Sequence, residues 1–165
     1  MAFLNIIILM KNQLSTNFSL DEFTNSATAM NHGICNEAPV EVISNLQNLC
    51  QQVLQPVRDH LGVPVVITSG YRCRALNRLV GGVPNSQHIT GEAADAVIVQ
   101  SPQSIVKSSQ SIVDIGLMKE AFEWIRLNCD FDQLIWEQKN GRTWIHVSCC
   151  RKTGKNRKQV IYPKR

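Results

Sequence analysis

Residues 68–95 read TSGYRCRALNRLVGGVPNSQHITGEAAD, and this stretch decides how the chain is organised. It places His88 and Asp95 seven positions apart, with Gly91 between them. A third candidate ligand, His146, lies far downstream in WIHVS, a segment that we expect to form a strand. Two imidazoles and one carboxylate form a suitable ligand set for a catalytic zinc ion that keeps one position open for water. We therefore expect the fold to bring His88, Asp95 and His146 together.

Each candidate ligand has a simpler explanation when it is considered alone. A loop histidine such as His88 is more often an ordinary polar residue, and His146 is more often a hydrogen-bonded strand histidine. Asp95 lies in the apolar run AADAVIV, where a buried carboxylate is costly unless it is paired or binds a metal. A salt bridge to Arg72 would also satisfy this carboxylate. The combination of the three residues, rather than any one of them, favours the metal site.

The length and composition of the chain indicate a single globular domain. Its 165 residues are enough to bury a core, and 44% hydrophobic and 18% charged residues are ordinary globular values. No apolar run is long enough to span a bilayer. We expect an N-terminal extension at residues 1–16, one domain at residues 17–150 and a basic tail at residues 151–165. We also expect a monomer without a membrane span.

The two ends of the chain carry the signals for location and charge. Residues 1–10 are apolar, but they lack a preceding basic residue and a clear cleavage site, so they form a weak secretory signal. Met10 is an alternative start. We therefore expect the protein to remain in the cytoplasm until it is released or exported by another route. Much of the net charge of +4 lies in the tail, which predicts a solvated segment or, alternatively, a surface for an anionic polymer.

Six cysteines are spread through the chain. They show no C-x-x-C pair, and the chain is neither short nor rich enough in cysteine for a disulfide scaffold. We expect free thiols, and a thiolate zinc site is the less favoured alternative.

Apolar periodicity, capping residues and turn residues predict the elements of the domain. Ser19 and Glu22 form a capping box that starts a short helix, and Gly33 lies just past its end. Pro56 falls inside the longest apolar stripe, where we expect a kink or a break. The predicted helices cover residues 39–61, 74–80 and 117–127; the predicted strands cover residues 63–69, 93–99, 131–137 and 143–148; residues 81–91 and 100–111 are predicted loops.

Asn140 and Gly141 are a strong signal for a two-residue hairpin turn between the last two predicted strands. With these turn residues Glu137 pairs with Trp144, and paired residues share one face of the sheet. Glu137 and His146 are then diagonal neighbours, roughly 7–8 Å apart between backbone positions. A register slip of one residue would move Glu137 to the opposite face.

Glu137 is a candidate catalytic base because of this predicted position. A metal ion makes a nearby water easier to deprotonate, and a carboxylate within reach can take that proton and deliver it to a leaving amine. Considered alone, Glu137 is better explained as a solvent-facing strand residue. Arg72 ends a predicted strand, and its guanidinium could hold a substrate carboxylate or stabilise an oxyanion. Tyr71 and Trp144 could line the same cleft, although aromatic residues beside a site are more often packing residues.

Four segments of the chain resemble one known family. They are SGYRC at residues 69–73, SQHITGEAAD at residues 86–95, FDQLIWE at residues 131–137 and WIHVS at residues 144–148. Together they are similar to the zinc D-Ala-D-Ala carboxypeptidase and L-Ala-D-Glu endopeptidase family. Its relatives include vancomycin-resistance dipeptidases, phage endolysins and the hedgehog signalling domain. The resemblance covers most of the chain, from about residue 17 to residue 148.

The resemblance implies an α+β fold, in which a small antiparallel sheet of about four strands packs against helices and carries the zinc in a cleft. It implies one Zn²⁺ ion held by His88, Asp95 and His146. It also implies that the arginine at the end of the strand contacts the substrate. The candidate substrate-binding residues are Arg72, Tyr71, Ser86 and Trp144.

The resemblance also predicts a reaction, which is hydrolysis of an amide bond in the stem peptides of peptidoglycan. Carboxypeptidase-like cleavage of D-Ala-D-Ala is slightly favoured over endopeptidase cleavage of the endolysin type. In the dipeptidases and many endolysins the catalytic acidic residue lies three positions before the last histidine, where this chain has Thr143. Glu137 therefore takes that role, as in the hedgehog-like arrangement. A zinc-containing binding domain without turnover is the alternative function, and no nucleic-acid partner is expected.

Overall fold

The computed structural model describes residues 12–100, 113–150 and 155–162. The first half contains β1 (Gln13–Ser15), β2 (Phe18–Ser19), α2 (Leu20–Thr24), α3 (Ala27–Asn31), α4 (Val40–Leu49), the π-helical turn η1 (Cys50–Leu54), α5 (Gln55–Leu61) and β3 (Val65–Ser69). The second half contains α6 (Arg74–Leu79), α7 (Gln87–Thr90), β4 (Ala93–Ile98), α9 (Ile115–Asn128), β5 (Gln133–Lys139), β6 (Arg142–Ser148) and β7 (Gln159–Ile161). Apart from Gln100, the loop predicted at residues 100–111 lies outside the described residues.

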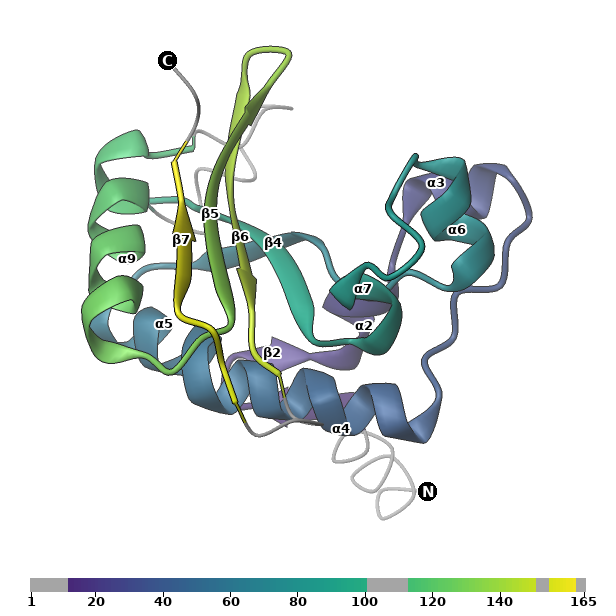
Figure 1. The fold of residues 1–165 in the computed structure, drawn as a ribbon, viewed down its shortest axis with the longest axis horizontal. Helices are drawn as coiled ribbons and strands as arrows, with labels where there is room; N and C mark the ends of the chain where they lie inside the picture. Colours follow the sequence, from purple (N-terminus) through teal and green to yellow (C-terminus); the bar gives the residue numbers. More distant parts are fainter. Residues whose placement is uncertain (1–11, 101–112, 151–154, 163–165) are drawn as a thin grey trace, which may run out of the picture.

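In the described part of the chain, five strands form the main sheet in the order β3-β4-β6-β5-β7, and a separate hairpin pairs β1 with β2. Neighbouring strands of the main sheet are antiparallel except β7, which runs parallel to β5. The four predicted strands and the α+β class are therefore confirmed. The fifth strand, β7, was not predicted: it lies within residues 151–165, which the sequence assigns to a basic tail, yet it forms an edge of the sheet (Figure 1).

The hairpin between β5 and β6 has the predicted register. Glu137 pairs with Trp144, and the pairing continues without a shift along the strands past His146. Asn140 and Gly141 have φ angles of 53° and 73°, the left-handed conformations that a type I′ turn requires. Because side chains alternate along a strand, Glu137, Trp144 and His146 project from the same face.

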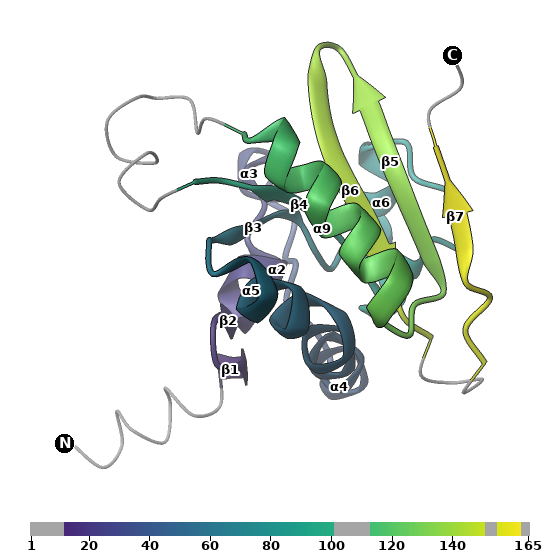
Figure 2. The same cartoon turned by 90° about the vertical axis from the view of Figure 1, so that its left-hand side faces the viewer.

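The two faces of the main sheet differ in character. One face is apolar, and α9 lies across it with α5 packed against α9 (Figure 2). Its fully or largely buried side chains are Ala94, Ala96, Ile98, Leu134, Trp136, Ile145 and Val147. Asp95 and His146 alternate with these residues along β4 and β6, so they project from the opposite face. Because apolar side chains occupy every second position and point to the covered face, the polar side chains between them gather on the other face of the sheet.

Pro56 is accommodated without a break in the long helical segment. Proline has no N–H, and its ring clashes with the carbonyl four residues earlier in a regular α-helix. Just before Pro56 the α-helix changes to the wider π-helical turn η1, in which the Gln55 N–H donates to the Cys50 carbonyl five residues earlier. Gly62 then ends α5 with φ 66°. Within the described ranges, no helix combines the length and the apolar character needed to cross a membrane.

The prediction of a loop over all of residues 81–91 is wrong in its second half. Gln87–Thr90 form the short helix α7, with Ser86 at its N-cap and Gly91 in the left-handed conformation just past its end. Both capping signals are present in the sequence. One helical turn is too short to produce an apolar period, which is why periodicity did not detect it. The helix matters because it carries His88.

Replacing Gly91 by alanine is expected to destabilise the fold by about 2–4 kcal/mol, since it combines left-handed backbone strain with overpacking. Gly91 has φ 71°, and an added Cβ would lie 2.7 Å from Val42 Cγ1 and 2.8 Å from the Val42 carbonyl oxygen. Gly81 is the matched control, because its φ is 75° but an added Cβ meets nothing within 4 Å. Urea unfolding measures the free energy of unfolding of both variants. An equal loss of this free energy in Gly91→Ala and Gly81→Ala would contradict the proposed packing role of Gly91.

Candidate metal centre

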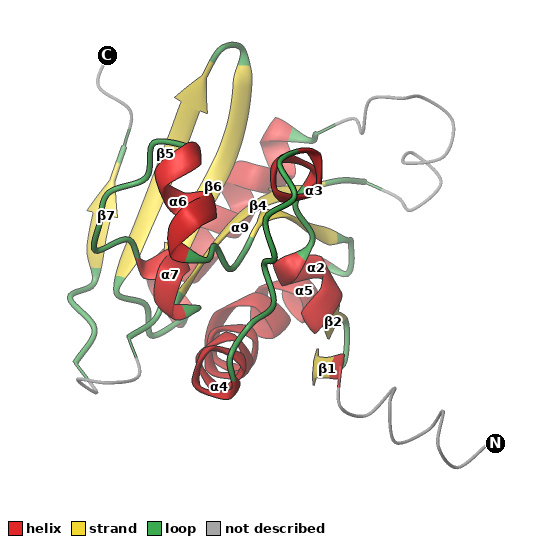
Figure 3. Cartoon of the chain, turned by 90° about the vertical axis from the view of Figure 1, so that its right-hand side faces the viewer, coloured by secondary structure: helices red, strands yellow, loops and turns green. Residues whose placement is uncertain are grey.

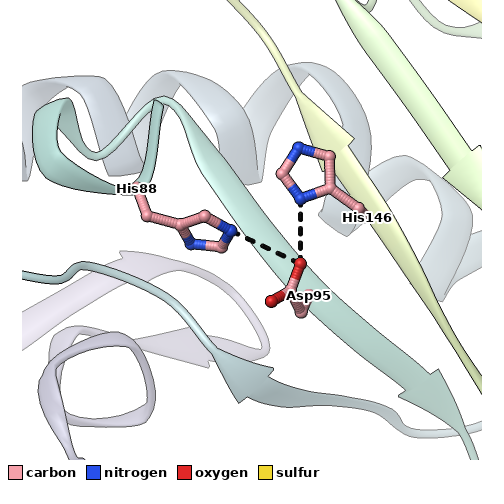
Figure 4. A group of neighbouring side chains, drawn as sticks. All are labelled: His88, Asp95 and His146. Carbon is pink, nitrogen blue, oxygen red and sulfur yellow. Dashed lines mark hydrogen bonds and ion pairs between the residues drawn. The ribbon is translucent and has the colours of Figure 1, made fainter. Parts of the chain in front are cut away.

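Three side chains from different elements converge on one point of the open sheet face. Asp95 and His146 are direct cross-strand partners on β4 and β6, and His88 approaches from α7, which lies beside β4 and next to α6 (Figure 3). Asp95 Oδ1 lies 2.9 Å from His146 Nδ1 and 3.4 Å from His88 Nε2 (Figure 4). One potential ligand atom from each residue lies within 4.8 Å of the other two. The predicted convergence is therefore present, and this cluster could hold a metal ion.

The hydrogen bonding of His88 fits a cation at this point. His88 Nδ1 lies 2.7 Å from the Gly70 carbonyl oxygen. A carbonyl oxygen can only accept, so Nδ1 carries the hydrogen, and in the neutral ring Nε2 is left with a lone pair. That lone pair faces Asp95 Oδ1, which is also an acceptor. Two acceptors that face each other in a buried site require a cation between them, either a proton or a metal ion.

Asp95 is held as a charged carboxylate. Burial by itself would raise its pKa, but where a proton lies between the rings and the carboxylate, the hydrogen bonds from His146 and His88 and the charge on these rings hold the pKa below its usual value. The second oxygen, Oδ2, accepts a hydrogen bond from Arg72 Nη2 at 2.9 Å. The salt bridge considered as an alternative for Asp95 is thus present. It coexists with the candidate metal site because the two partners use different carboxylate oxygens.

Arg72 is fixed by three contacts at the end of β3. Besides its bond to Asp95, its Nε donates to Ser69 Oγ at 3.0 Å. Its backbone N–H donates to the His88 carbonyl at 3.1 Å. The side chain therefore holds Asp95 in position, and it also lines a cavity of about 500 Å³ next to the cluster.

Glu137 lies on the same face as His146 and is half-buried. Its pKa is raised, first by burial and then by the negative charge of Asp95, against the opposing effect of His146, His88 and Arg72. These interactions identify Glu137 as a close neighbour of the cluster. A carboxylate with a raised pKa holds a proton more readily, which suits a general base and acid.

The residue at the position of the family's usual catalytic acid lies on the other side of the strand. Thr143 pairs with Gln138, and its hydroxyl accepts a hydrogen bond from Gln138 Nε2 at 3.4 Å. Strand alternation therefore directs Thr143 away from the face that carries His146. Glu137 is the carboxylate that shares the face with the cluster.

The other candidate substrate residues differ in their surroundings. Tyr71 is 8% exposed and packs in the core, although it also borders the cavity beside Arg72. The Ser86 hydroxyl accepts a hydrogen bond from the His88 backbone N–H at 3.4 Å, so it caps α7. Trp144 is half-buried and lines a second cavity of about 800 Å³. Of these residues, Trp144 is the one that shares a sheet face with His146 and Glu137.

Within the described residues, the remaining histidines and the cysteines are not part of the candidate metal-binding group. His60 stacks on Trp124 with 4.8 Å between ring centroids, and His32 is exposed. All six cysteines fall within the described residues and are free thiols, as predicted.

A hydrogen-bond network that the sequence did not reveal ties the C-terminal segment to α7. Asp132 is 1% exposed and accepts bonds from the backbone N–H and the Nε–H of Arg157 at 3.0 and 2.8 Å. Gln87, the residue before His88, donates to Asp132 Oδ2 at 3.0 Å. The network therefore holds α7 against the base of the β5–β6 hairpin. No motif or periodic pattern could have identified Arg157, because its partner lies 25 residues away.

Replacing Arg157 by glutamine is expected to lower stability at neutral pH by on the order of 2 kcal/mol. The hydrogen bonds from Arg157 are the main reason why the pKa of Asp132 is lowered to about 2. A pKa lower in the folded than in the unfolded state stabilises the fold above about pH 4, and this contribution is lost as the pH falls toward about 2. The melting-temperature difference between wild type and Arg157→Gln should therefore shrink across that range.

Arg126→Gln is the control for this measurement, because the Arg126–Glu123 pair is exposed at the surface and such pairs contribute little. A melting-temperature difference for Arg157→Gln that stays constant from about pH 2 to pH 7 would contradict the assigned role of Asp132.

The fold and the site together define a class of protein. It is an α+β domain with a candidate site for a single metal ion on the open face of its sheet and a carboxylate beside that site. The family model described as Peptidase M15 matches residues 16–125 of the chain. Because this match covers more than half of the chain, the protein belongs to the Peptidase M15 family, whose members are zinc-dependent peptidases. No curated protein matches the chain.

The family match contains His88 and Asp95 and ends before the β5–β6 hairpin. It confirms the resemblance that the motifs predicted. The tertiary structure brings His146 and Glu137, which lie beyond the matched span, to the same sheet face as Asp95.

Proposed function

We propose that the protein is a zinc metallopeptidase that hydrolyses an amide bond in peptidoglycan stem peptides. The observation that carries this proposal is the convergence of His88, Asp95 and His146, with Glu137 on the same sheet face, in a member of the M15 family. We favour carboxypeptidase-like cleavage of a D-Ala-D-Ala terminus over endopeptidase cleavage of an L-Ala-D-Glu bond.

Three side chains would hold the zinc ion: His88 through Nε2, Asp95 through Oδ1 and His146 through Nδ1. When bound, zinc acts as a Lewis acid that polarises the scissile carbonyl and lowers the pKa of a water. Arg72 occupies the second oxygen of Asp95 and so keeps the first directed at the imidazoles. The Gly70 carbonyl keeps the proton of His88 on Nδ1 and leaves Nε2 free to bind.

Glu137 would move the proton in this reaction. Its carboxylate accepts a proton from the attacking water, whose oxygen joins the carbonyl carbon of the substrate. The same carboxyl group then delivers that proton to the amide nitrogen as the carbon–nitrogen bond breaks. The products are a carboxylic acid and an amine, and Glu137 returns to its starting state.

The proposal is tested by mass spectrometry of muropeptides incubated with the zinc-loaded protein. Loss of a terminal D-alanine is expected, and the mass of the products identifies the bond that is cut. Protein stripped of metal by a chelator is the control. Unchanged muropeptide masses, with one zinc bound per chain, would contradict the proposed reaction and favour a binding domain without turnover.

A further inference from the structure

Two cavities beside the main sheet share two lining residues. The cavity of about 500 Å³ is bordered by Arg72 and other residues at the end of β3, and the cavity of about 800 Å³ is bordered by Val97 and Trp144. Both are lined by Thr68 and Arg142. The two cavities therefore adjoin at Thr68 and Arg142 and together form one cleft. Its first part contains Arg72, which bonds Asp95 of the metal cluster, and its second part reaches Gly141 in the β5–β6 turn.

Among the described residues that line this cleft, Arg142 is the cation whose side chain has no partner. Its side chain is exposed, and its guanidinium makes no hydrogen bond or ion pair within the described residues. Arg72, by contrast, is held by Asp95 and Ser69. The described residues that line the two cavities include no aspartate or glutamate. An anion entering the cleft thus meets an uncompensated positive charge at Arg142.

The position of Arg142 along β6 sets how far from the metal cluster a group bound by Arg142 would lie. Arg142 and His146 are four residues apart and project from the same face. Four strand residues span about 13 Å, and an Arg142 side chain that extends along the strand toward the cluster would leave a gap of about two extended peptide residues. Between them, Val97 and Trp144 offer an apolar floor for the intervening part of the substrate.

We propose that Arg142 forms a subsite for a substrate carboxylate that lies about two residues from the scissile bond. This inference rests on the proposed peptidase function and adds the substrate class, which is an acidic peptide. In carboxypeptidase-like cleavage a single residue follows the scissile bond, so the recognised carboxylate must lie before it. Arg142 is a specificity residue in this scheme and takes no part in the bond-breaking step.

The test uses two synthetic peptides that end in D-Ala-D-Ala and differ at one group. The residue two positions before the scissile bond carries a free carboxylate in one peptide and the corresponding carboxamide in the other. Wild-type protein is expected to prefer the carboxylate peptide by about tenfold to a hundredfold in kcat/KM, as for a hydrogen bond to a charged group. Arg142→Gln should bring the two kcat/KM values together, and Arg142→Lys should retain part of the preference.

Lys139→Gln is the matched control. Lys139 pairs with Arg142 across the same hairpin and carries the same charge, but it lines neither of the two cavities. The preference should survive in this variant. A preference that persists in Arg142→Gln, or that disappears equally in Lys139→Gln, would overturn the assignment to Arg142.

The same peptides separate this inference from the proposed function. If wild type hydrolyses both peptides at equal rates, the peptidase proposal stands and the Arg142 subsite fails. If wild type hydrolyses neither peptide, the peptidase proposal fails, and calorimetric titration of the zinc-loaded protein decides the subsite. The subsite is supported if wild type binds the carboxylate peptide more tightly than the carboxamide peptide and Arg142→Gln binds both with the same affinity. Equal affinities of wild type for the two peptides reject the subsite.

Discussion

Replacing Glu137 by glutamine is expected to lower kcat on muropeptides by about 10²–10⁴-fold, the range that a positioned proton-transfer group contributes. Glutamine keeps the size of the side chain but cannot accept the proton from water. Zinc content should remain at one ion per chain, because Glu137 lies outside the group of candidate ligands. The two measurements are steady-state hydrolysis of a D-Ala-D-Ala peptide and zinc analysis of the purified variant.

Glu120→Gln provides the comparison for this variant, since Glu120 is an exposed residue of α9 on the covered side of the sheet. Its kcat should match that of wild type. A Glu137→Gln protein that retains both zinc and full activity would remove Glu137 from the mechanism. Loss of zinc together with activity would instead make Glu137 part of the metal site.

The pH profile gives a second check on Glu137. Burial and the charge of Asp95 raise its pKa, and a general base acts only when it is deprotonated. The rate should therefore rise with pH through a pKa above that of an ordinary glutamate. In Glu137→Gln this acidic limb should disappear from the residual activity.

Replacing His146 by alanine is expected to weaken zinc binding by more than about a hundredfold, because even residues that only support a ligand contribute about 10–100-fold. The variant loses one of three candidate ligand side chains and the hydrogen bond to Asp95 Oδ1. Hydrolysis should fall to the level of metal-free protein. Zinc affinity is measured by competition with a chromophoric chelator.

Thermal unfolding distinguishes metal loss from misfolding in this variant. A ligand that binds only the native state raises its melting temperature, so zinc should stabilise wild type and leave His146→Ala unchanged. His60→Ala is the control, because His60 stacks on Trp124 away from the cluster. Zinc affinity close to that of wild type in His146→Ala would exclude this residue from the ligand set.

The elements around the site could be predicted because their signals are local. The β-branched and apolar runs specify β3, β4, β5 and β6, and Asn140-Gly141 specifies the turn that puts Glu137 on the same face as His146. Backbone geometry alone produces these signals, since a strand alternates faces and a type I′ turn needs left-handed residues. The helix α7 was missed because one turn is too short to show a period, although its cap residues were visible.

Other parts of the site depend on contacts between residues that are far apart in the chain. The sequence left open whether Asp95 pairs with Arg72 or binds a metal, and the structure supplies a separate carboxylate oxygen for each role. The Gly70 carbonyl that sets the tautomer of His88 has no side chain and so no sequence signal. These are consequences of packing, which sequence spacing does not encode.

By itself the sequence determined the motif that carries His88 and Asp95, the strands, the hairpin register and the family to which the chain belongs. Only the tertiary structure decided that β7 and Arg157 belong to the folded domain and that Arg142 stands where two cavities meet. The physical reason is the range of the interactions. Turn and strand preferences act between neighbours in the chain, whereas an ion pair or a cleft forms only when whole elements pack against each other.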